Sequence, residues 1–377
     1  MSANRRTDRS GGNVSRWTFA ALLLGVVTFA STPAVAQRPP TDRHVRELAR
    51  YLDGVKIAEP IVYRQLAVYP LLVDDVPLLR GRWLTLDAAL SRGVLVIREK
   101  GAASVPAVWV ENNSPDEYVL LVQGEVIKGG MQTRTVRHNA VLAPGQKLEV
   151  AVLCVEAHRW AGGKEFSAAR TMVPQAIQGE LRRGAGQSEV WSGVARNNRA
   201  LGAENDTGSL ERALKSAPVE EKLDAVRRKI VPEVPQGATG FIFVSRERAV
   251  GAELFGSETL ARELLPKLLD SYAVDYVVLR EPGHEREDKA GDRAAIEFFE
   301  RVCRTGSVRA NTPGSGSGIR TAAGGLLGDG VSLDGVLVHY GVQAGERVVP
   351  RPVPPPRPPI IWPRRGGSEE ERPPLVR

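Results

Sequence analysis

The sequence predicts an α+β fold in which an antiparallel β block, either sandwich-like or an open sheet, carries several helices. Three observations support this prediction. Short strand-like segments joined by turn residues fill 94–156, helical periodicity dominates 187–303, and strand-like segments return at 331–342. Because elements of one kind come in blocks, an alternating βαβ arrangement is not expected.

The expected elements of the first half include two short helices and a series of strands. The spacing of apolar residues predicts one helix over 43–52, ended by Gly54, and a second over 85–90, with strands between them over 57–73. The β block is expected as five segments with turn residues between them, at 94–98, 105–111, 118–127, 132–142 and 147–156. Short connections of this kind favour antiparallel pairing.

The second half is expected to begin with helices over 187–231, interrupted by a polar stretch at 202–208. A hairpin of 240–244 with 249–255 follows, and Ser257 can cap a helix that Pro266 should kink. A further helix is predicted over 292–303. The last strands are expected over 331–342, around the turn at Asp334-Gly335.

Composition excludes several classes of protein. The 377 residues are 42% hydrophobic and 25% charged, as in folded globular proteins, and not as in collagens or disulfide-stapled domains. The net charge of +7 is confined to the ends, with +3 in 1–36 and +4 in 347–377. The body is therefore neutral overall, and a nucleic-acid partner is not expected.

The two ends differ in composition from the body. Residues 1–36 carry four arginines, an apolar run and a small-residue site ending at Ala36, which predicts a secretory signal peptide and an exported, periplasmic or extracellular protein without stable membrane insertion after cleavage. Residues 37–55 are expected as an N-terminal helix and linker, and 56–345 as a single α+β domain. The Pro/Arg-rich residues 346–377 are expected to be a disordered tail that contacts a partner or the envelope surface.

Few residues point to metal, cofactor or disulfide chemistry. No metal-binding histidine pair, Cys-x-x-Cys motif or phosphate-binding glycine loop is present, so neither a metal nor a cofactor is expected. Cys154 and Cys303 would close a long loop if they formed a disulfide. Because Cys154 lies within an apolar run, it can equally be a small buried hydrophobic residue, and both possibilities stay open.

Polar and aromatic residues are dense around the end of the β block. They are the candidate ligand-binding residues, and two of them, Glu125 and Glu156, are also candidate catalytic acids or bases. The set comprises Glu125, Lys128, Gln132, Arg134, Glu156, Arg159, Trp160, Gln187 and Trp191. The alternative is structural: Glu125 with Arg134 and Glu156 with Arg159 would form ion pairs that close turns, and the two tryptophans would pack in the core.

These same segments resemble the ARG and rhodanese-phosphatase-superfamily-associated domain family over about 62–340. The resemblance runs in order through 84–90, Gly124-Glu125 with Gln132 and Arg134, then 154–160 and 187–191, and ends more loosely at 318–320 and 337–339. Many members have Lys where Met131 stands and a small residue where His158 stands. The family has no established activity and is named for association with ADP-ribosylglycohydrolases and rhodanese-like phosphatases, which implies a nucleotide- or ADP-ribose-like ligand.

Three functions remain open from the sequence. A binding module would hold a polar or anionic small molecule through Glu, Gln, Arg and Trp side chains. A hydrolase would use Glu125 and Glu156 as a carboxyl pair to cleave a phosphoester, N-glycosidic or ADP-ribosyl bond. A structural envelope protein would instead bury its polar groups in pairs. Binding is favoured because no nucleophile-plus-base arrangement is visible.

Overall fold

The computed structural model describes residues 41–101, 106–279 and 291–345. The expected signal peptide and Pro-rich tail lie outside the described residues. Within these ranges the fold is α+β, with sheets that are almost entirely antiparallel, which confirms the predicted class. The one parallel pair of named strands joins the strands Arg82–Thr85 and Glu117–Leu121.

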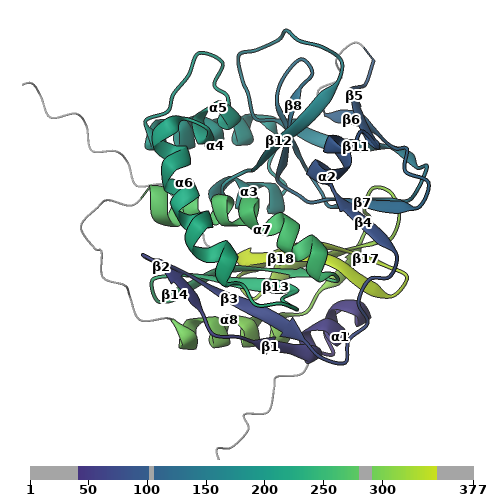
Figure 1. Cartoon of the computed structure of the whole chain (residues 1–377), viewed down its shortest axis with the longest axis vertical. Helices are drawn as coiled ribbons and strands as arrows, with labels where there is room; N and C mark the ends of the chain where they lie inside the picture. Colours follow the sequence, from purple (N-terminus) through teal and green to yellow (C-terminus); the bar gives the residue numbers. More distant parts are fainter. Residues whose placement is uncertain (1–40, 102–105, 280–290, 346–377) are drawn as a thin grey trace, which may run out of the picture. The chain divides into compact units, whose positions relative to one another are not determined.

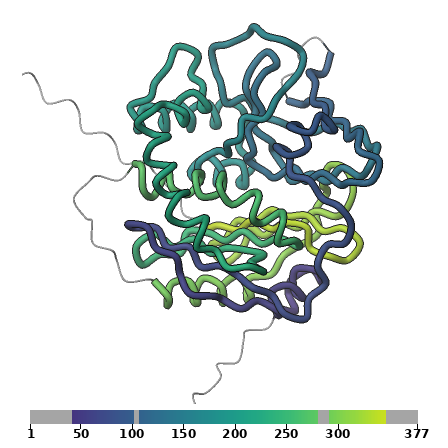
Figure 2. The backbone as a smooth tube through the Cα atoms, viewed as in Figure 1, coloured from purple at the N-terminus to yellow at the C-terminus, as the bar shows by residue number. Residues whose placement is uncertain are grey.

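The largest sheet has nine strands and combines both ends of the described chain. Its order is β1-β3-β13-β14-β18-β17-β16-β15, with β2 paired to β3. Figure 2 shows the purple N-terminal strands and the yellow C-terminal strands in one layer. The strands are β1 (Val55–Ile57), β2 (Ile61–Tyr63), β3 (Leu66–Val73), β13 (Gly240–Ser245), β14 (Arg248–Phe255), β15 (Val308–Ala310), β16 (Ser317–Ala323), β17 (Leu326–Leu333) and β18 (Val336–Ala344). Both predicted hairpins are confirmed.

Helices cover both faces of this sheet (Figure 1). α1 (Arg46–Gly54) and α8 (Asp292–Thr305) pack on one face, and α6 (Ala217–Ile230) and α7 (Glu258–Ala273) on the other. Successive side chains of β13 point to opposite faces of the sheet and enter the two cores in turn. Phe241 and Phe243 face α7, while Ile242 faces α8. The sheet is therefore buried on both sides.

The β block lies beyond α7 and has its own core. It consists of a three-stranded sheet, β10-β7-β4, and a six-stranded sheet, β12-β8-β9-β11-β6-β5. Their inward side chains, such as Leu84, Val108 and Val150, form one buried cluster. The strands are β4 (Arg82–Thr85), β5 (Leu95–Glu99), β6 (Ala107–Asn112), β7 (Glu117–Leu121), β8 (Glu125–Gly129), β9 (Arg134–Val136), β10 (Ala140–Leu142), β11 (Lys147–Cys154) and β12 (Phe166–Met172).

Two expected strands are each divided in two. The segment 118–127 forms β7 and β8, and 132–142 forms β9 and β10, so that β7 pairs with β10 while β8 pairs with β9. The break falls at Gly124, whose φ of +90° turns the chain, and a Cβ there would lie 2.1 Å from Oε1 of Gln178. The division places Glu125 at the start of a new strand.

Four further α-helices lie between β4 and α6 along the described chain. They are α2 (Leu86–Ser91), α3 (Gln175–Arg182), α4 (Gln187–Leu201) and α5 (Leu210–Leu214). Ser257 caps α7 as predicted, and the helix is unbroken at Pro266 before it ends in a π-helical turn, η2 (Val274–Val278). A short 3₁₀ helix, η1 (Val231–Glu233), follows α6. Among the described helices, none has the length and hydrophobicity to cross a bilayer.

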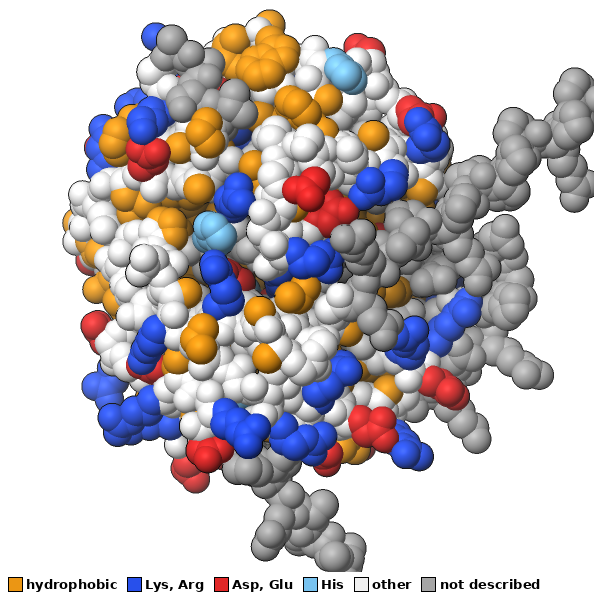
Figure 3. Space-filling view, turned by 180° about the vertical axis from the view of Figure 1, so that it is seen from behind, with side chains coloured by type: hydrophobic (Ala, Val, Ile, Leu, Met, Phe, Trp, Pro, Cys, Tyr) orange, Lys and Arg blue, Asp and Glu red, His pale blue; other side chains and the backbone are white. Residues whose placement is uncertain are grey.

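Cys154 and Cys303 are both buried, and they are not joined in a disulfide. Cys303 packs among the apolar side chains between α8 and the nine-stranded sheet, whereas Cys154 ends β11 in the β block. The disulfide that the sequence left open is therefore absent. On the molecular face in Figure 3, basic and acidic side chains of the described residues are interspersed, with several Lys and Arg along the lower edge.

Candidate functional site

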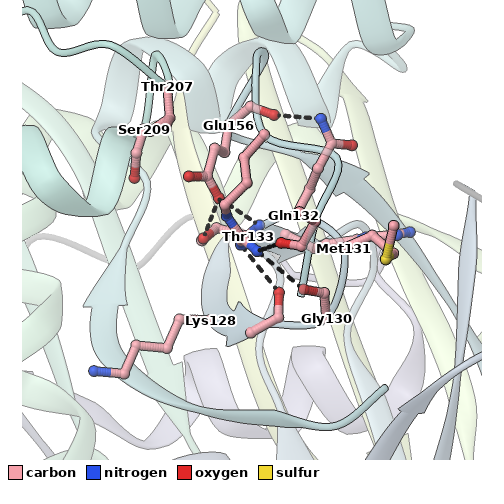
Figure 4. Close-up of polar contacts among 12 residues, drawn as sticks. Lys128, Gly130, Met131, Gln132, Thr133, Glu156, Thr207 and Ser209 are labelled. Carbon is pink, nitrogen blue, oxygen red and sulfur yellow. Dashed lines mark hydrogen bonds and ion pairs between the residues drawn. The ribbon is translucent and has the colours of Figure 1, made fainter. Parts of the chain in front are cut away.

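A first polar cluster forms where β8 and β9 meet the end of β11 (Figure 4). Oε2 of Glu156 accepts hydrogen bonds from the backbone N–H and hydroxyl of Thr133, at 3.0 and 2.9 Å, and from two guanidinium nitrogens of Arg159, at 3.0 and 2.8 Å. Burial acts to raise the pKa of Glu156, but these hydrogen bonds outweigh it and hold the pKa below its ordinary value. Glu156 is thus a carboxylate fixed by its neighbours.

The double glycine between β8 and β9 is held by the same cluster. Arg159 donates to the carbonyl oxygens of Gly130, at 3.0 Å, and Gly129, at 3.2 Å, while Nε2 of Gln132 donates to the carbonyl of Glu156 at 2.8 Å. Gly130 has φ +52°, and a Cβ there would lie 2.3 Å from the ring of Phe166. The close packing and the left-handed conformation both require glycine.

Arg134 lies next to this cluster and forms a buried ion pair. Its Nη2 lies 2.9 and 3.0 Å from the two carboxylate oxygens of Glu99, and the side chains are 0% and 3% exposed. The guanidinium also lies over the ring of Phe166, 5.8 Å from its centroid. The structural alternative paired Arg134 with Glu125, and this pairing is wrong, because the β8–β9 register turns Arg134 toward the end of β5 instead.

Glu125 belongs to a second polar centre. Its Oε1 contacts Nζ of Lys267, which is also 2.6 Å from Oδ2 of Asp87, so that one buried ammonium lies between two carboxylates. Oε2 of Glu125 accepts the backbone N–H of Val122 at 2.6 Å. Burial raises the pKa of Glu125 despite the ammonium, and the Asp87 charge adds to the rise. For Lys267, burial acts to lower the pKa, but the two carboxylates raise it above its ordinary value.

Lys267 and Asp87 open onto a pocket of about 370 Å³, which we name the lysine pocket. This volume is within the range that holds small ligands. Its charged lining comes from α2, β12, the α5–α6 region and α7: Asp87, Arg170, Lys215, Glu220, Arg227, Glu263, Lys267 and Asp270. Three of these, Glu263, Lys267 and Asp270, follow at helical spacing and share one face of α7.

Asp270 is a buried carboxyl with unused hydrogen-bonding capacity. It is 7% exposed, its Oδ2 accepts from Arg227 at 2.5 Å, and its buried Oδ1 has no hydrogen-bond partner within the described ranges. Burial raises the pKa of Asp270 to about 6, against the lowering effect of Arg227. A carboxyl that titrates near neutrality in a pocket is suited to bind a hydroxyl or to transfer a proton.

Arg170 supplies an unpaired cation at the same pocket. It is an exposed residue with φ +55°, at the irregularity between Ala168 and Met172 where β12 loses register with β8. Within the described part of the chain, its guanidinium forms no ion pair or hydrogen bond. A non-glycine residue in this conformation is strained, and such strain is concentrated at functional sites.

The other predicted site residues lie away from the lysine pocket. Gln187 joins α4 to β11, since its side-chain amide accepts the backbone N–H of Cys154 and donates to the same residue's carbonyl, both at 2.8 Å. Lys128 is exposed, with Nζ 4.0 Å from Glu211. Trp160 is 51% exposed, so the alternative of core packing is wrong for it, and Trp191 is half-buried. As ligand-binding residues, all of these remain predictions.

The start of α4 is capped by a side chain of the helix itself. The helix begins after Gly186, whose backbone N–H donates to Oε2 of Glu189 at 2.6 Å. A side-chain carboxylate thus occupies the place of an external anion. The residues from 187 to 191 therefore have a clear structural role in holding α4 against the β block.

Sequence reasoning missed the four side chains that define the lysine pocket: Asp87, Arg170, Lys267 and Asp270. A signal was present for two of them, because Lys267 and Asp270 are charged residues in the mostly apolar segment 264–273 and are nonetheless buried. Arg170 had none, since its positive φ depends on the β12 irregularity. Among the residues that the structure describes, no group of three His, Cys, Asp or Glu is arranged to hold a metal.

Comparison with known families identifies a family that covers most of the chain. The model of the ARG and Rhodanese-Phosphatase-superfamily-associated Protein domain family matches residues 54–342. No curated protein and no solved structure matches the chain. Two of the segments that carried the resemblance, 84–90 and Gly124-Glu125, meet at Lys267 through Asp87 and Glu125.

Proposed function

The chain belongs to the ARG and Rhodanese-Phosphatase-superfamily-associated Protein domain family, and we propose that it binds a polar, anionic small molecule in the lysine pocket. One observation carries the proposal: the pocket combines an unpaired, strained Arg170 with a buried Asp270 whose Oδ1 has no partner among the described residues. Unsatisfied buried polar atoms cost free energy, so they are expected where a ligand supplies the missing partner.

The two groups fit complementary parts of one ligand. Arg170 can bind a phosphate or carboxylate with parallel hydrogen bonds, and Asp270 can accept a hydrogen bond from a hydroxyl. Lys267 is already neutralised by Asp87 and Glu125, so it orients Asp87 and adds little free charge. A sugar phosphate has both required groups, and the association for which the family is named supports a nucleotide- or ADP-ribose-like member of that class.

Calorimetric titration of the full chain with ADP-ribose, AMP and inorganic phosphate tests this proposal. We expect ADP-ribose or AMP to bind at least tenfold more tightly than phosphate, because only they also supply hydroxyls. Arg170→Ala and Asp270→Asn should each weaken that binding at least tenfold. Arg64→Ala is the matched control, since Arg64 is another exposed arginine, with φ +54°, that does not line the pocket.

Two outcomes would reject the proposal. One is that none of the three probes binds the full chain at millimolar concentration. The other is that Arg64→Ala weakens binding as much as Arg170→Ala, which would indicate attraction by general charge and not by this pocket. Gln132→Ala and Arg159→Ala, tested in the same titration, decide the predicted role of the Glu156 cluster.

A hydrolase acting on a phosphoester or glycosidic bond is the second candidate function. It is favoured by Asp270, whose pKa of about 6 suits a general acid, and by Asp87, a carboxylate in the same pocket that could activate water. In such a step the Asp270 proton would pass to the leaving oxygen while Asp87 takes one from the attacking water. The pair expected from the sequence, Glu125 and Glu156, stays the alternative catalytic pair, with each carboxylate bonded to a different cation.

Turnover of p-nitrophenyl phosphate and p-nitrophenyl glycosides separates this function from binding alone. A hydrolase with Asp270 as its acid should lose activity as the pH rises through about 6, and Asp270→Asn should lower kcat at least 100-fold. Activity that is absent in the full chain, or unchanged in Asp270→Asn, would leave only the binding function.

We further propose that the protein acts after export, which the order of basic, apolar and small residues in 1–36 supports. Mass spectrometry of the protein from the producing cell's envelope should then give an N-terminus at or near Gln37. An intact Met1 would contradict export by cleavage. A purely structural envelope role would be supported if the titrations and turnover assays above all gave negative results.

A further inference from the structure

A second pocket, of about 610 Å³, lies away from the lysine pocket and differs from it in character. Its walls come from the segment before β4, from two aromatic residues of β4 and β7, and from the turn between β17 and β18. They are lined by Val76, Pro77, Leu78, Leu79, Arg80, Trp83, Tyr118, Leu333, Asp334 and Val336. Most of these side chains are apolar, so we name it the aromatic pocket.

The aromatic pair in this pocket is held rigidly. The rings of Trp83 and Tyr118 are stacked, with centroids 4.9 Å apart and planes at 20°. The indole N–H donates to the carbonyl of Arg80 at 3.1 Å, and the backbone N–H of Leu79 donates to Gly256 at 2.8 Å. The wall before β4 is thereby fixed, and a ligand would find the pocket already formed.

The aromatic pocket nevertheless leaves apolar surface and a hydroxyl unused. Leu78 is 41% exposed and lines the pocket together with two partly exposed aromatic rings, so apolar surface is gathered here. The hydroxyl of Tyr118 has no hydrogen bond to another described residue. Stacked aromatic rings with a free donor match the grooves that bind polyproline II segments, in which prolines pack on the rings and a backbone carbonyl accepts a hydrogen bond.

We propose that the aromatic pocket binds the chain's own Pro-rich segment, 354–359. The reach of the chain supports this occupant. β18 starts at the pocket with Val336 and carries the chain about 27 Å away to Ala344. From Gly345 to Pro354 the chain can return about 28 Å in a polyproline II conformation. Arg357, within the proline run, can then pair with Asp334 at the pocket.

The test uses a fluorescent peptide with the sequence of 350–363, titrated into full-length protein by anisotropy. In wild type the tethered tail competes at millimolar effective concentration, so the peptide should bind weakly. In a full-length variant with Pro354, Pro355, Pro358 and Pro359 replaced by Ser, the peptide should bind at least tenfold more tightly. Equal binding to the two proteins, or no binding to the serine variant, would overturn the proposal.

Substitutions in the pocket locate the binding site. Leu78→Ser, introduced into the serine variant, should weaken peptide binding at least tenfold, and because Leu78 is exposed the protein should still fold. Ile296→Ser is the matched control, since Ile296 is a comparably exposed aliphatic residue on α8, at 50%. An equal loss of peptide binding in both variants would mean that the peptide binds outside the aromatic pocket.

Sedimentation tests whether the tail binds within its own chain. Wild type should be a monomer, and dimers that the peptide dissociates would mean that a second copy's tail occupies the pocket.

Discussion

The Glu156 cluster and the lysine pocket contain the same kinds of side chain and use them differently. In the cluster, one carboxylate oxygen of Glu156 meets four donor groups, although Oε1 of Gln132 has no hydrogen-bond partner among the described residues, and beside the cluster Arg134 is buried against Glu99. In the lysine pocket, Arg170 is unpaired among the described residues and Asp270 retains a free oxygen. Satisfied polar groups stabilise a fold, whereas unsatisfied ones beside a cavity indicate a ligand. Charge type alone does not distinguish them.

The largest expected effect is in the cluster. Arg134→Ala removes one partner of a fully buried ion pair and leaves Glu99 uncompensated, which should lower the free energy of unfolding by about 3–5 kcal/mol. Urea unfolding followed by circular dichroism measures it. Arg98→Ala, on the same strand as Glu99, is the control, because its pair with Glu165 is exposed and should contribute less than about 1 kcal/mol. Equal effects would show that burial does not separate the two pairs.

The next effect concerns the pH dependence of stability in the lysine pocket. The pKa of Asp270 rises from 3.8 to about 6 on folding, so the folded chain binds this proton more strongly than the unfolded chain. The resulting stabilisation is complete below about pH 3.8 and is lost as the pH rises to about 6. The Asp270→Asn variant has no carboxyl to titrate at this position, so its stability does not fall in this way. The free energy of unfolding of the variant, relative to that of wild type, should therefore increase by about 2–3 kcal/mol between pH 4 and pH 7.5, as measured by urea unfolding. A constant difference would contradict the raised pKa.

A smaller effect is expected for Glu156→Gln. The amide oxygen can still accept hydrogen bonds from Thr133, but the charge that strengthens them and attracts Arg159 is lost, at a cost of about 1–2 kcal/mol. Thermal unfolding at pH 7.5 detects the change. Since the pKa of Glu156 is lowered on folding, wild type should lose this advantage as the pH falls through that lowered pKa, below the ordinary range of a glutamate. If the variant is as stable as wild type at pH 7.5, the charge of Glu156 does not stabilise the fold, and the cluster would resemble a ligand site.

The smallest effect should be a gain in stability at Arg170. Glycine adopts φ +55° without strain, so Arg170→Gly should raise the free energy of unfolding by about 0.5–1 kcal/mol. The same variant should lose the binding of ADP-ribose or AMP, which separates stability from function. If Arg170→Gly is destabilising, the side chain has a structural role, and the contrast between the two regions is weaker than described.

Much of the fold could be predicted because its signals are local. Apolar periodicity and the Ser257 cap located α7, and Asp334-Gly335 located the last hairpin. β16 was missed because the glycines of 314–330 conceal its alternation. The division of 118–127 at Gly124 was missed because it depends on Gln178, a contact 54 positions along the chain.

The candidate site could be predicted only in part. Glu125 lies in a polar centre, but the other members of that centre, Asp87 and Lys267, are 38 and 142 positions away and no local pattern joins them. Glu156 and Arg159 were recognised as a possible ion pair because three positions separate them. Ion pairs between residues of distant elements depend on tertiary packing. The apolar periodicity of a single element carries no information on that packing.

The nine-stranded sheet has a consequence for how the chain folds. β3 pairs with β13, and Leu71 lies opposite Gly240, so the β block and five helices are completed between two neighbouring strands. Contacts of such long sequence separation form slowly. During synthesis the apolar β3 has no β13 to pair with until the intervening residues are made, while the β block between them can already fold around its own core. A newly made chain therefore passes through a stage in which one half is packed and a hydrophobic strand is uncovered, the period when chaperone contact or aggregation is decided.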